Sequence, residues 1–322
     1  MFKWIRPLLT VGLMGLAAGA AIAQEYPTKP ITLIVPFAPG GSSDLISRLL
    51  GQKLTEAFKQ QVIVDNRGGG AGFVGMQAAA RAAPDGYTLI LGHIGTLAVN
   101  PAMFAKMPYK VDEFAPVTLV ATVPNVLVVS PALPAKTFQE FIKLAKEKPG
   151  TLNYGSAGIG SAGHLAMEYL KQKTGIEMSH VPYKGTGPMI TDLLSGQTQA
   201  TFTGAPPLMP HIKADKLRPL AVGSAKRLET LPDVPSVAEQ DYPGFETSQW
   251  YGILAPAKTP APIVQKLAAE IHRALQNPEV IERFQHDGSI PTASTPEEFA
   301  AFIQKEAKLW GDIVKAAGIQ PN

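Results

Sequence analysis

The segment Ile31-Thr32-Leu33-Ile34-Val35-Pro36 runs directly into Phe37-Ala38-Pro39-Gly40-Gly41-Ser42-Ser43-Asp44, and an amphipathic helix pattern begins near Leu45. The first six residues have the apolar character of a buried β-strand, and the next eight form a glycine- and serine-rich loop. Such a junction points unpaired backbone N–H groups and the positive end of the helix dipole at one spot. It therefore predicts an anion-binding site at the start of the helix.

The same order of elements recurs later in the chain. Residues 152–155 form a strand pattern, residues 156–163 form a loop of glycine, serine, alanine and isoleucine, and a helix pattern starts at His164. Two anion-binding junctions in one chain suggest two lobes that hold one small anionic molecule between them.

The first residues have the pattern of an export signal. Lys3 and Arg6 precede an apolar and small-residue run over residues 8–20, and residues 21–23 have the small-x-small form of a cleavage site. The run is shorter than the roughly 20 apolar residues of a membrane span, which disfavours a retained anchor. We expect residues 1–23 to be a signal peptide, the mature chain to start at Gln24, and the protein to reside in the periplasm.

Charge and cysteine content exclude several classes of function. The chain has a formal net charge of +3, and loss of Lys3 and Arg6 with the signal peptide leaves it nearly neutral. No nucleic-acid partner is expected, because phosphate binding needs a concentrated basic surface. The chain has no cysteine, so thiol nucleophiles and cysteine metal sites are excluded and stability must come from a sizeable core.

Strand and helix patterns alternate along most of the chain, which predicts an α/β fold around a mainly parallel sheet. Two extended runs, residues 117–123 and 125–130, flank Pro124 and indicate a crossing into a second lobe, and the run 249–255 indicates the return. We expect lobe 1 to comprise residues 24–123 and 251–322, and lobe 2 to comprise residues 124–250.

The C-terminal part is predicted to be helical. Apolar residues recur every four positions from Ile263 to Leu275, which predicts a helix that packs on lobe 1. Thr295 and Glu298 have the spacing of a capping box and predict the start of the last helix.

Two segments, residues 70–75 and 158–163, match the dinucleotide pattern G-x-G-x-x-G. A dinucleotide site also needs an acidic residue at the end of the next strand, to hold the ribose. The corresponding strands end in Gly92-His93 and Val181-Pro182. We therefore expect no dinucleotide cofactor, and these glycines indicate either close backbone approach to a smaller anion or tight turns alone.

No pattern predicts a catalytic or metal centre. Ser42, Ser156 and Ser161 lie on strand-to-helix turns, but none has glycine at both flanking positions of a nucleophile elbow. The six histidines show no metal-binding spacing. We expect no enzyme activity, no metal and no cofactor, and we expect the serine hydroxyls to cap helices or to donate to a ligand.

Five other polar residues are candidates for ligand contact, each with a structural alternative. His93 and His164 follow strands at the edge where open α/β sheets bind ligands, although turn capping or packing explains each of them equally well. Arg67, Lys184 and Arg218 are candidates for neutralising a bound carboxylate, and a surface or inter-strand ion pair is the favoured interpretation for each.

Several segments along the whole mature length resemble one known family. The chain is similar to the extracytoplasmic solute-binding proteins of tripartite tricarboxylate transporters, the Bug or TctC family. The matching segments are Tyr26-Pro27-Thr28-Lys29-Pro30-Ile31, Val35-Pro36-Phe37-Ala38-Pro39-Gly40-Gly41 with Asp44, Val64-Asp65-Asn66-Arg67, Pro84-Asp85-Gly86-Tyr87-Thr88-Leu89, Asn100-Pro101, Leu152-Asn153-Tyr154-Gly155-Ser156-Ala157-Gly158 with His164, His180-Val181-Pro182-Tyr183-Lys184-Gly185, Leu231-Pro232-Asp233-Val234-Pro235 and Trp250-Tyr251-Gly252.

The resemblance implies a two-lobed periplasmic-binding-protein fold of type II, the Venus-flytrap arrangement, with two strands crossing between the lobes. It also implies a monomer that binds a small organic carboxylate through loops of both lobes and delivers it to a membrane permease of one large and one small subunit. The ligand-binding residues predicted on this basis and from strand-end position are Phe37, Gly40, Gly41, Ser42, Asp44, His93, Thr96, Ser156, Ala157, Gly158, Ser161, His164, Thr203 and Gly204.

The sequence leaves the ligand and part of the role open. A dicarboxylate, a tricarboxylate, an aromatic acid or an amino acid would each suit backbone-amide binding. Two alternatives to transport are a ligand-sensing subunit of a membrane kinase and a periplasmic hydrolase that uses Ser42 or Ser161 with a nearby histidine. Departures from the family pattern occur at residues 66–72 and at Phe104, where the family commonly has tyrosine.

Overall fold

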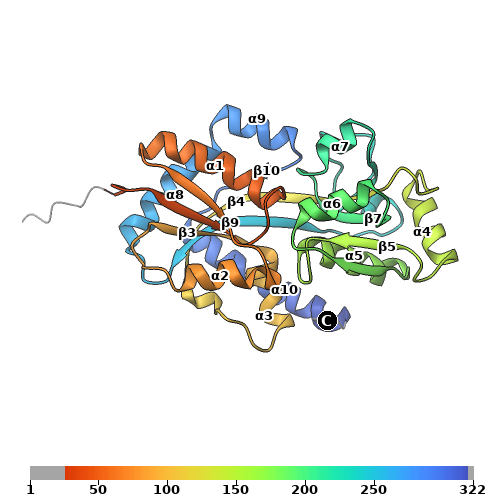
Figure 1. Cartoon of the computed structure of the whole chain (residues 1–322), viewed down its shortest axis with the longest axis horizontal. Coiled ribbons are helices and arrows are strands. Elements are labelled where there is room, and N and C mark those ends of the chain that lie inside the picture. The colour runs from red at the N-terminus through yellow and green to blue at the C-terminus, as the bar shows by residue number, and fades with distance from the viewer. Residues whose placement is uncertain (1–25, 318–322) are drawn as a thin grey trace, which may run out of the picture.

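The computed structural model describes residues 26–317, so the predicted signal peptide and Gln24 lie outside the described residues. Figure 1 shows two groups of helices and strands side by side, joined by two long strands that run through both. No helix within residues 26–317 is long and apolar enough to cross a membrane.

The strands alternate with helices, as the sequence predicts. The strands are β1 (Ile31–Val35), β2 (Val62–Asn66), β3 (Thr88–His93), β4 (Phe114–Val129), β5 (Asn153–Ser156), β6 (Ser179–Pro182), β7 (Ala200–Gly204), β8 (Arg218–Val222), β9 (Ser248–Pro256) and β10 (Ile290–Pro291). The helices are α1 (Ser42–Phe58), α2 (Phe73–Ala80), α3 (Asn100–Met103), α4 (Phe138–Glu147), α5 (Ala162–Thr174), α6 (Thr186–Leu194), α7 (Met209–Lys213), α8 (Ala261–Leu275), α9 (Pro278–His286) and α10 (Pro296–Ala317).

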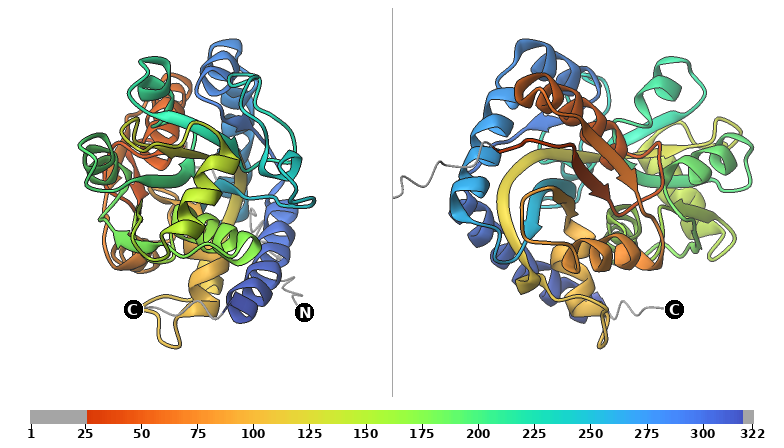
Figure 2. Two further views of the ribbon diagram at one scale, coloured as in Figure 1. Left: turned by 90° about the vertical axis from the view of Figure 1, so that its right-hand side faces the viewer. Right: turned by 60° about the vertical axis from the view of Figure 1, so that its left-hand side comes forward.

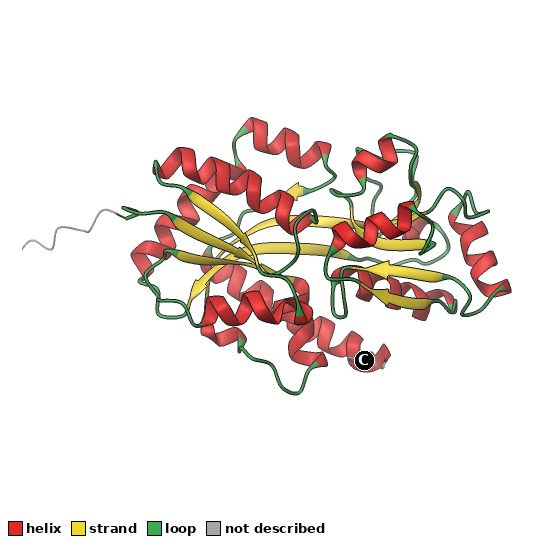
Figure 3. Ribbon diagram, in the orientation of Figure 1, coloured by secondary structure: helices red, strands yellow, loops and turns green. Residues whose placement is uncertain are grey.

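The two long strands are β4 and β9, which cross from one lobe to the other in opposite directions (Figure 3). β4 pairs with β9 as far as Pro124, opposite Ser248, and pairs with β7 from Asn125 onward. The sequence predicts two runs interrupted by Pro124, whereas β4 is one continuous strand. Pro124 lies where β4 changes partner, a place at which the missing N–H of proline is tolerated.

The sheet is parallel only inside each lobe. β1 pairs with β2 and β3 in parallel, and β5 pairs in parallel with β6 and β7. β9 pairs antiparallel with β3 and β4 because it returns from lobe 2 to lobe 1. The prediction of a mainly parallel sheet is therefore correct for the lobes and wrong for the crossing strands.

Lobe 1 has helices on both faces of its sheet (Figure 2). The apolar stripe of α8 is buried, with Leu267 and Ile271 fully inaccessible, and it contacts α1 and β4 as predicted. The capping box of α10 is also present, since Glu298 N donates to Thr295 Oγ1 and Thr295 N donates to Glu298 Oε2. In this lobe the apolar cores lie on either side of the sheet and fix the position at which α1 begins.

Candidate functional site

A small cavity lies between the lobes, at the N-terminal ends of α1 and α5. Its free space amounts to about 20 Å³, which is room for one water molecule. No charged side chain is among its lining residues within the described chain, and we call it the inner cavity. It is lined by Phe37, Ala38, Gly41, Ser42, Ser43, His93, Ala157, Ser161, Ala162, Gly163, Thr186, Thr203, Gln249 and Tyr251.

The start of α1 supplies main-chain donors to the inner cavity. The first bond of the helix runs from Asp44 N to Gly41 O, so the N–H groups of Ser42 and Ser43 precede the hydrogen-bond ladder. The N-cap residue Gly41 contributes no side-chain cap. The dipole of this helix of 17 residues adds a positive partial charge at the same place. The helix starts three residues before the predicted Leu45, and the predicted loop residues are therefore its first turn.

Asp44 organises the loop before α1 and does not face the cavity. Its buried carboxylate accepts from Gly40 N at 3.0 Å and from Arg48 Nε at 3.1 Å. Burial raises the pKa of Asp44, but the hydrogen bonds from Arg48 and Gly40 outweigh it and hold the pKa below its usual value. The N–H of Gly40 is consequently bonded to Asp44, so it does not point to a ligand.

The start of α5 faces α1 from lobe 2. Ser161 caps the helix, since its Oγ accepts from His164 N at 3.4 Å. Two loop donors are bonded internally, Gly158 N to Ser156 Oγ and Gly160 N to His164 Nδ1. The first-turn N–H groups of Ala162 and Gly163, both of which line the inner cavity, precede the first ladder bond, Leu165 N to Ser161 O.

The floor of the inner cavity is a hydrogen-bond network between the crossing strands. Gln249 on β9 donates from Nε2 to Asn125 Oδ1 on β4 at 3.0 Å and to Thr203 Oγ1 on β7 at 3.4 Å. Its Oε1 accepts from the hydroxyl of Tyr251. His93 Nε2 lies 3.4 Å from the same oxygen. Gln249 therefore connects residues of both lobes with the strands between them.

His93 is neutral in this network. Gly95 N donates to its Nδ1 at 2.9 Å, which places the ring proton on Nε2, where it donates to Gln249. Burial lowers the pKa of His93 to about 4. Phe37 packs edge-on against the ring at 5.1 Å between centroids. The imidazole thus presents no positive charge to an anion at neutral pH.

Ser156 and two histidines lie behind the α5 loop, inside lobe 2. Ser156 Oγ is 2.6 Å from His180 Nε2, and the rings of His180 and His164 stack at 4.2 Å. Burial, with smaller contributions from His164 and Lys171, lowers the pKa of His180 to about 3. His180 Nδ1 has no hydrogen-bond partner within residues 26–317, and Ser156 is inaccessible to solvent. The pair therefore lacks the oriented histidine and exposed hydroxyl of a hydrolase.

A larger cavity of about 270 Å³ adjoins the inner cavity and shares Phe37, Ala157 and Ser161 with it. We call it the outer cavity. Lys184 carries the one charged side chain among the lining residues that the structure describes. The outer cavity is lined by Phe37, Gly69, Gly70, Ala71, Gly72, Gly95, Ala157, Gly158, Ile159, Gly160, Ser161, Pro182, Tyr183 and Lys184.

The lobes touch each other around these cavities at two glycine residues of lobe 2. A Cβ atom placed on Gly185, before α6, would lie 2.7 Å from the Cβ of Ala38 in the α1 loop. One placed on Gly204 would lie 2.7 Å from Ser42 Oγ and 2.8 Å from Gln249 Nε2. Only glycine permits this approach, so the described conformation is one in which the lobes are closed on each other.

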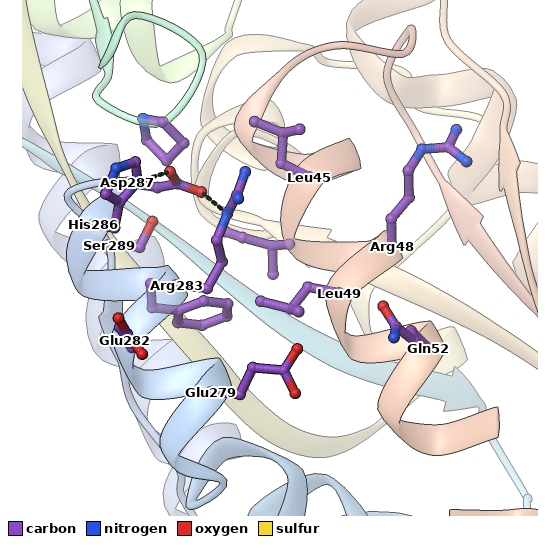
Figure 4. A pocket seen from close by; sticks show the side chains of 13 residues that line it. Leu45, Arg48, Leu49, Gln52, Glu279, Glu282, Arg283, His286, Asp287 and Ser289 are labelled. Atoms are coloured by element: carbon purple, nitrogen blue, oxygen red, sulfur yellow. Dashed lines mark hydrogen bonds and ion pairs between the residues drawn. The ribbon is translucent and has the colours of Figure 1, made fainter. Parts of the chain in front are cut away.

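A still larger groove of about 620 Å³ lies on the opposite side of α1, against α9 (Figure 4). Several of its charged side chains are paired: Arg283 with Asp287, Arg48 with Asp44, and Glu279 with Lys53. Among its described lining residues, Pro206 comes from lobe 2 and none comes from α5. The inner and outer cavities are therefore the better candidate for the functional site, although they are smaller.

The cavities contain eight of the predicted ligand-binding residues: Phe37, Gly41, Ser42, His93, Ala157, Gly158, Ser161 and Thr203. Gly40, Asp44, Thr96, Ser156, His164 and Gly204 line neither cavity. Thr96 Oγ1 forms hydrogen bonds with the backbone of His93. Gly204 packs directly against Ser42. Gly40, Asp44, Ser156 and His164 form hydrogen bonds within the two loops, as described above. Direct ligand contact by these six residues stays a prediction.

The prediction lacks several residues that line the cavities, Gln249 and Tyr251 above all. In the sequence, Gln249 stands out only as a polar residue near the start of an otherwise apolar strand. No local pattern indicates that this strand lies next to the loops before α1 and α5. Of the candidate cations, Arg67 pairs with Asp65, and Arg218 donates to the carbonyls of Leu133 and Ala135. Lys184 is exposed and has no ion pair within residues 26–317.

Comparison with known proteins shows which family the chain belongs to. Residues 46–319 match the model of the tripartite tricarboxylate transporter family receptor, TctC. The chain belongs to this family. It is 38% identical over 318 residues to protein BugT of Bordetella pertussis, with 97% of this chain and 98% of BugT covered.

Solved structures of similar proteins have the same fold. A protein of R. palustris solved with adipate is 36% identical, with a TM-score of 0.90 over 92% of this chain and all of the other. MatC from Rhodopseudomonas palustris, with bound malate, is 32% identical, with a TM-score of 0.85 over 90% of this chain and all of MatC. The chain is thus a periplasmic solute-binding receptor of the TctC type, with the two-lobed fold that the sequence predicts.

Residues 26–317 contain no group of three or more histidine, aspartate or glutamate side chains placed to hold a metal ion.

Proposed function

We propose that this receptor captures a small organic carboxylate between its lobes and delivers it to a membrane permease of the tripartite tricarboxylate type, with one large and one small subunit. The observation that carries the proposal is the convergence of the N-termini of α1 and α5 on a cavity without charged side chains. Two helix dipoles and their first N–H groups stabilise an anion there, and the exclusion of water from the closed cavity strengthens each interaction.

The ligands of related proteins support the chemical class. Adipate and malate, named in two of the similar structures, are both carboxylates. A carboxylate accepts hydrogen bonds from several N–H groups at once and needs no cationic partner when helix termini supply the positive potential. Its binding requires no chemical step from the protein.

We further propose that the lobes divide at residues 123/124 and 250/251 and rotate there when ligand enters. The change of partner along β4 at Pro124 and Asn125 supports the first boundary. The hydrogen bond between Asn125 and Gln249 supports the second, because it joins the two crossing strands at one level. The inner cavity accepts a ligand from solvent only if the lobes first separate.

The test is a thermal-shift screen of the mature protein against a library of carboxylates, followed by calorimetry on the best ligand. Binding to the folded state alone raises the melting temperature with ligand concentration. Saturable one-to-one binding without turnover supports a receptor. Turnover of an ester or amide would instead favour the hydrolase alternative, and absence of binding by any acid would overturn the proposal.

A proline variant tests the main-chain donors directly. Ala162 is the first residue of α5, a position at which proline fits the helix while removing one N–H, and Ser161 already has the extended backbone that precedes proline. Ala162→Pro should weaken carboxylate binding about ten- to a hundredfold, the value of one hydrogen bond to a charged group. The matched control is Ala261→Pro, the same change at the start of α8 outside the cleft.

The membrane partner needs its own measurement. Purified permease reconstituted in vesicles should accumulate the labelled carboxylate only when the receptor is present. Cross-linking of the receptor to a membrane kinase, with no effect on uptake, would favour the sensor alternative.

A further inference from the structure

We infer that the end of α9 is a latch between the lobes: His286 of lobe 1 accepts a hydrogen bond from Lys213 of lobe 2 when the lobes are closed, and protonation of His286 releases it. This inference rests on the proposed rotation of the lobes and adds a means of regulating it. The latch uses no residue that lines the inner or the outer cavity.

The latch joins two helices that belong to different lobes. Lys213 Nζ, in the last turn of α7, lies 2.6 Å from His286 Nε2, in the last turn of α9. The buried Ile212 anchors α7 in the core of lobe 2, and the buried Phe284 anchors α9 in the core of lobe 1. The bond therefore ties one lobe core to the other.

The position of His286 follows from the way in which α9 ends. Gly288 has a φ of 74°, the left-handed conformation that commonly ends a helix. A Cβ atom placed on Gly288 would lie 2.9 Å from the Cβ of Ala205 in lobe 2. Two residues further, Ile290 pairs with Thr122 of β4. The segment that carries His286 is thus fixed on lobe 1 and lies against lobe 2.

The two partners of the imidazole ring fix its protonation state. A lysine side chain has only donors, so Nε2 of His286 accepts from Lys213. Nδ1 lies 3.0 Å from Asp287 Oδ1, which is an acceptor, so Nδ1 carries the proton. Asp287 Oδ2 accepts in turn from Arg283 Nε at 2.9 Å (Figure 4). The bond to Lys213 therefore exists only while the imidazole is neutral.

A second proton on the ring removes this bond. It adds an N–H at Nε2, so two positively charged donors face each other where the lobes meet. Asp287 belongs to the same lobe as His286 and attracts the charged ring, so the imidazolium stays on lobe 1 while Lys213 loses its acceptor. Histidine side chains change charge between about pH 5 and 8. The latch should hence weaken as the surroundings become acidic.

The neighbouring charges offer no substitute for the latch. The other titratable and charged groups that line the groove beside His286, or lie on the segments of lobe 2 next to it, are Arg48, Glu279, Glu282, His211, Arg227 and Glu229. Arg48 and Glu279 pair within lobe 1, and Arg227 pairs with Glu239 within lobe 2. Among the described residues, none of these six forms a side-chain bond between the lobes.

The experiment measures the separation of the lobes without any ligand. The chain has no cysteine, so Ala269→Cys on α8 and Gln172→Cys on α5, both at exposed positions, take one spin label each. Pulsed electron paramagnetic resonance then gives the distribution of distances between the lobes. Gly185→Ala in the same background is the reference for separated lobes, because its methyl group would collide with Ala38 on closure.

Three variants test the latch in this background. Lys213→Met removes the donor and keeps an aliphatic stem. His286→Gln keeps an acceptor for Lys213 and a donor for Asp287 but does not titrate. Lys216→Met is the matched control, since Lys216 follows the same helix, is exposed, and has no salt bridge within residues 26–317.

At pH 8 we expect Lys213→Met to lower the ratio of closed to open molecules about two- to fivefold, the range for an exposed charged contact. Lys216→Met should leave the ratio unchanged. Between pH 8 and pH 5.5 the wild-type ratio should fall by a similar factor, because His286 gains its second proton. The ratio in His286→Gln should change less over the same range.

Other results would overturn the inference in distinguishable ways. Unchanged distances in Lys213→Met, or a shift toward the closed form, would reject the latch while a shift in Gly185→Ala upholds the rotation. Equal pH responses of the wild type and His286→Gln would reject release by protonation. Identical distances in every variant, Gly185→Ala included, would reject the rotation and the latch together.

Discussion

Gln249 of the returning strand β9 donates to Asn125 of the outgoing strand β4 at 3.0 Å, at the level where the two lobes meet. Both side chains are buried, and each has further partners, Thr203 for Gln249 and Thr247 for Asn125. The two crossing strands are therefore linked by side chains as well as by their backbone ladder. This contact fixes the floor of the inner cavity relative to both lobes.

Gln249→Leu should reduce the free energy of unfolding by about 2 to 4 kcal/mol. The substitution leaves Asn125 Oδ1 and His93 Nε2 without a partner, and each such buried atom costs about 1 to 3 kcal/mol. Urea unfolding of the ligand-free protein measures the loss. Gln52→Leu on the exposed face of α1 is the control and should change stability by less than about 0.5 kcal/mol. Equal effects of the two changes would show that the network contributes nothing.

The burial of His93 predicts a pH dependence of stability. Its pKa is lowered to about 4 in the folded protein, against 6.5 in the unfolded chain. The unfolded state binds more protons between these values, so stability is greatest above pH 6.5 and falls as the pH decreases toward 4. The shift corresponds to a loss of about 3 kcal/mol.

Urea unfolding at pH 7, 5.5 and 4.5 measures this loss, and His93→Gln isolates it. The stability of His93→Gln should fall less steeply with acidification than that of the wild type. Parallel curves for the two proteins would mean that His93 is not the titrating group.

Ser156→Ala should destabilise lobe 2 by about 1 to 3 kcal/mol, because His180 then loses its partner at Nε2, while its Nδ1 already has no partner among residues 26–317. The change also removes the acceptor of Gly158 N, so the α5 loop becomes less ordered and carboxylate affinity falls. Thermal unfolding and calorimetry measure the two effects. Ser195→Ala, at the exposed end of α6, serves as the reference. An unchanged melting temperature in Ser156→Ala would refute this role of the hydroxyl.

Gly185→Ala should favour separated lobes. The new methyl group would lie 2.7 Å from the Cβ of Ala38 when the lobes are closed, and the backbone φ of 144° is strained for alanine. Gly196→Ala also places alanine at a positive φ, 81°, but its methyl group would meet no described atom within 4 Å apart from its chain neighbours. It therefore tests positive φ without the contact between lobes.

Ligand affinity in Gly185→Ala should drop at least tenfold, and small-angle scattering with ligand present should give a larger radius of gyration. Gly196→Ala should lose stability without losing affinity. If both variants bind with wild-type affinity, the contact between Gly185 and Ala38 does not limit closure.

The amino-acid sequence by itself determined the local parts of this protein. Residues 31–58 are recognisable as strand, loop and helix from their hydrophobic pattern and glycine content. The four-residue spacing of apolar residues predicts the buried face of α8, and the spacing of Thr295 and Glu298 predicts the cap of α10. These features depend on residues within one or two turns of each other. For the same reason, both helix starts were predictable to within three residues, Leu45 against the observed Ser42 and His164 against the observed Ala162. The anion site that they imply stays a prediction.

Only the tertiary structure decided which of these groups face the cavities. Gly40 and Gly158 lie in the predicted loops, yet their N–H groups are bonded to Asp44 and Ser156. Gln249 reaches His93 across 156 positions of sequence and Thr203 across 46. Such contacts depend on how the crossing strands pair and how the lobes close, which follow from packing of the whole chain and leave no local pattern.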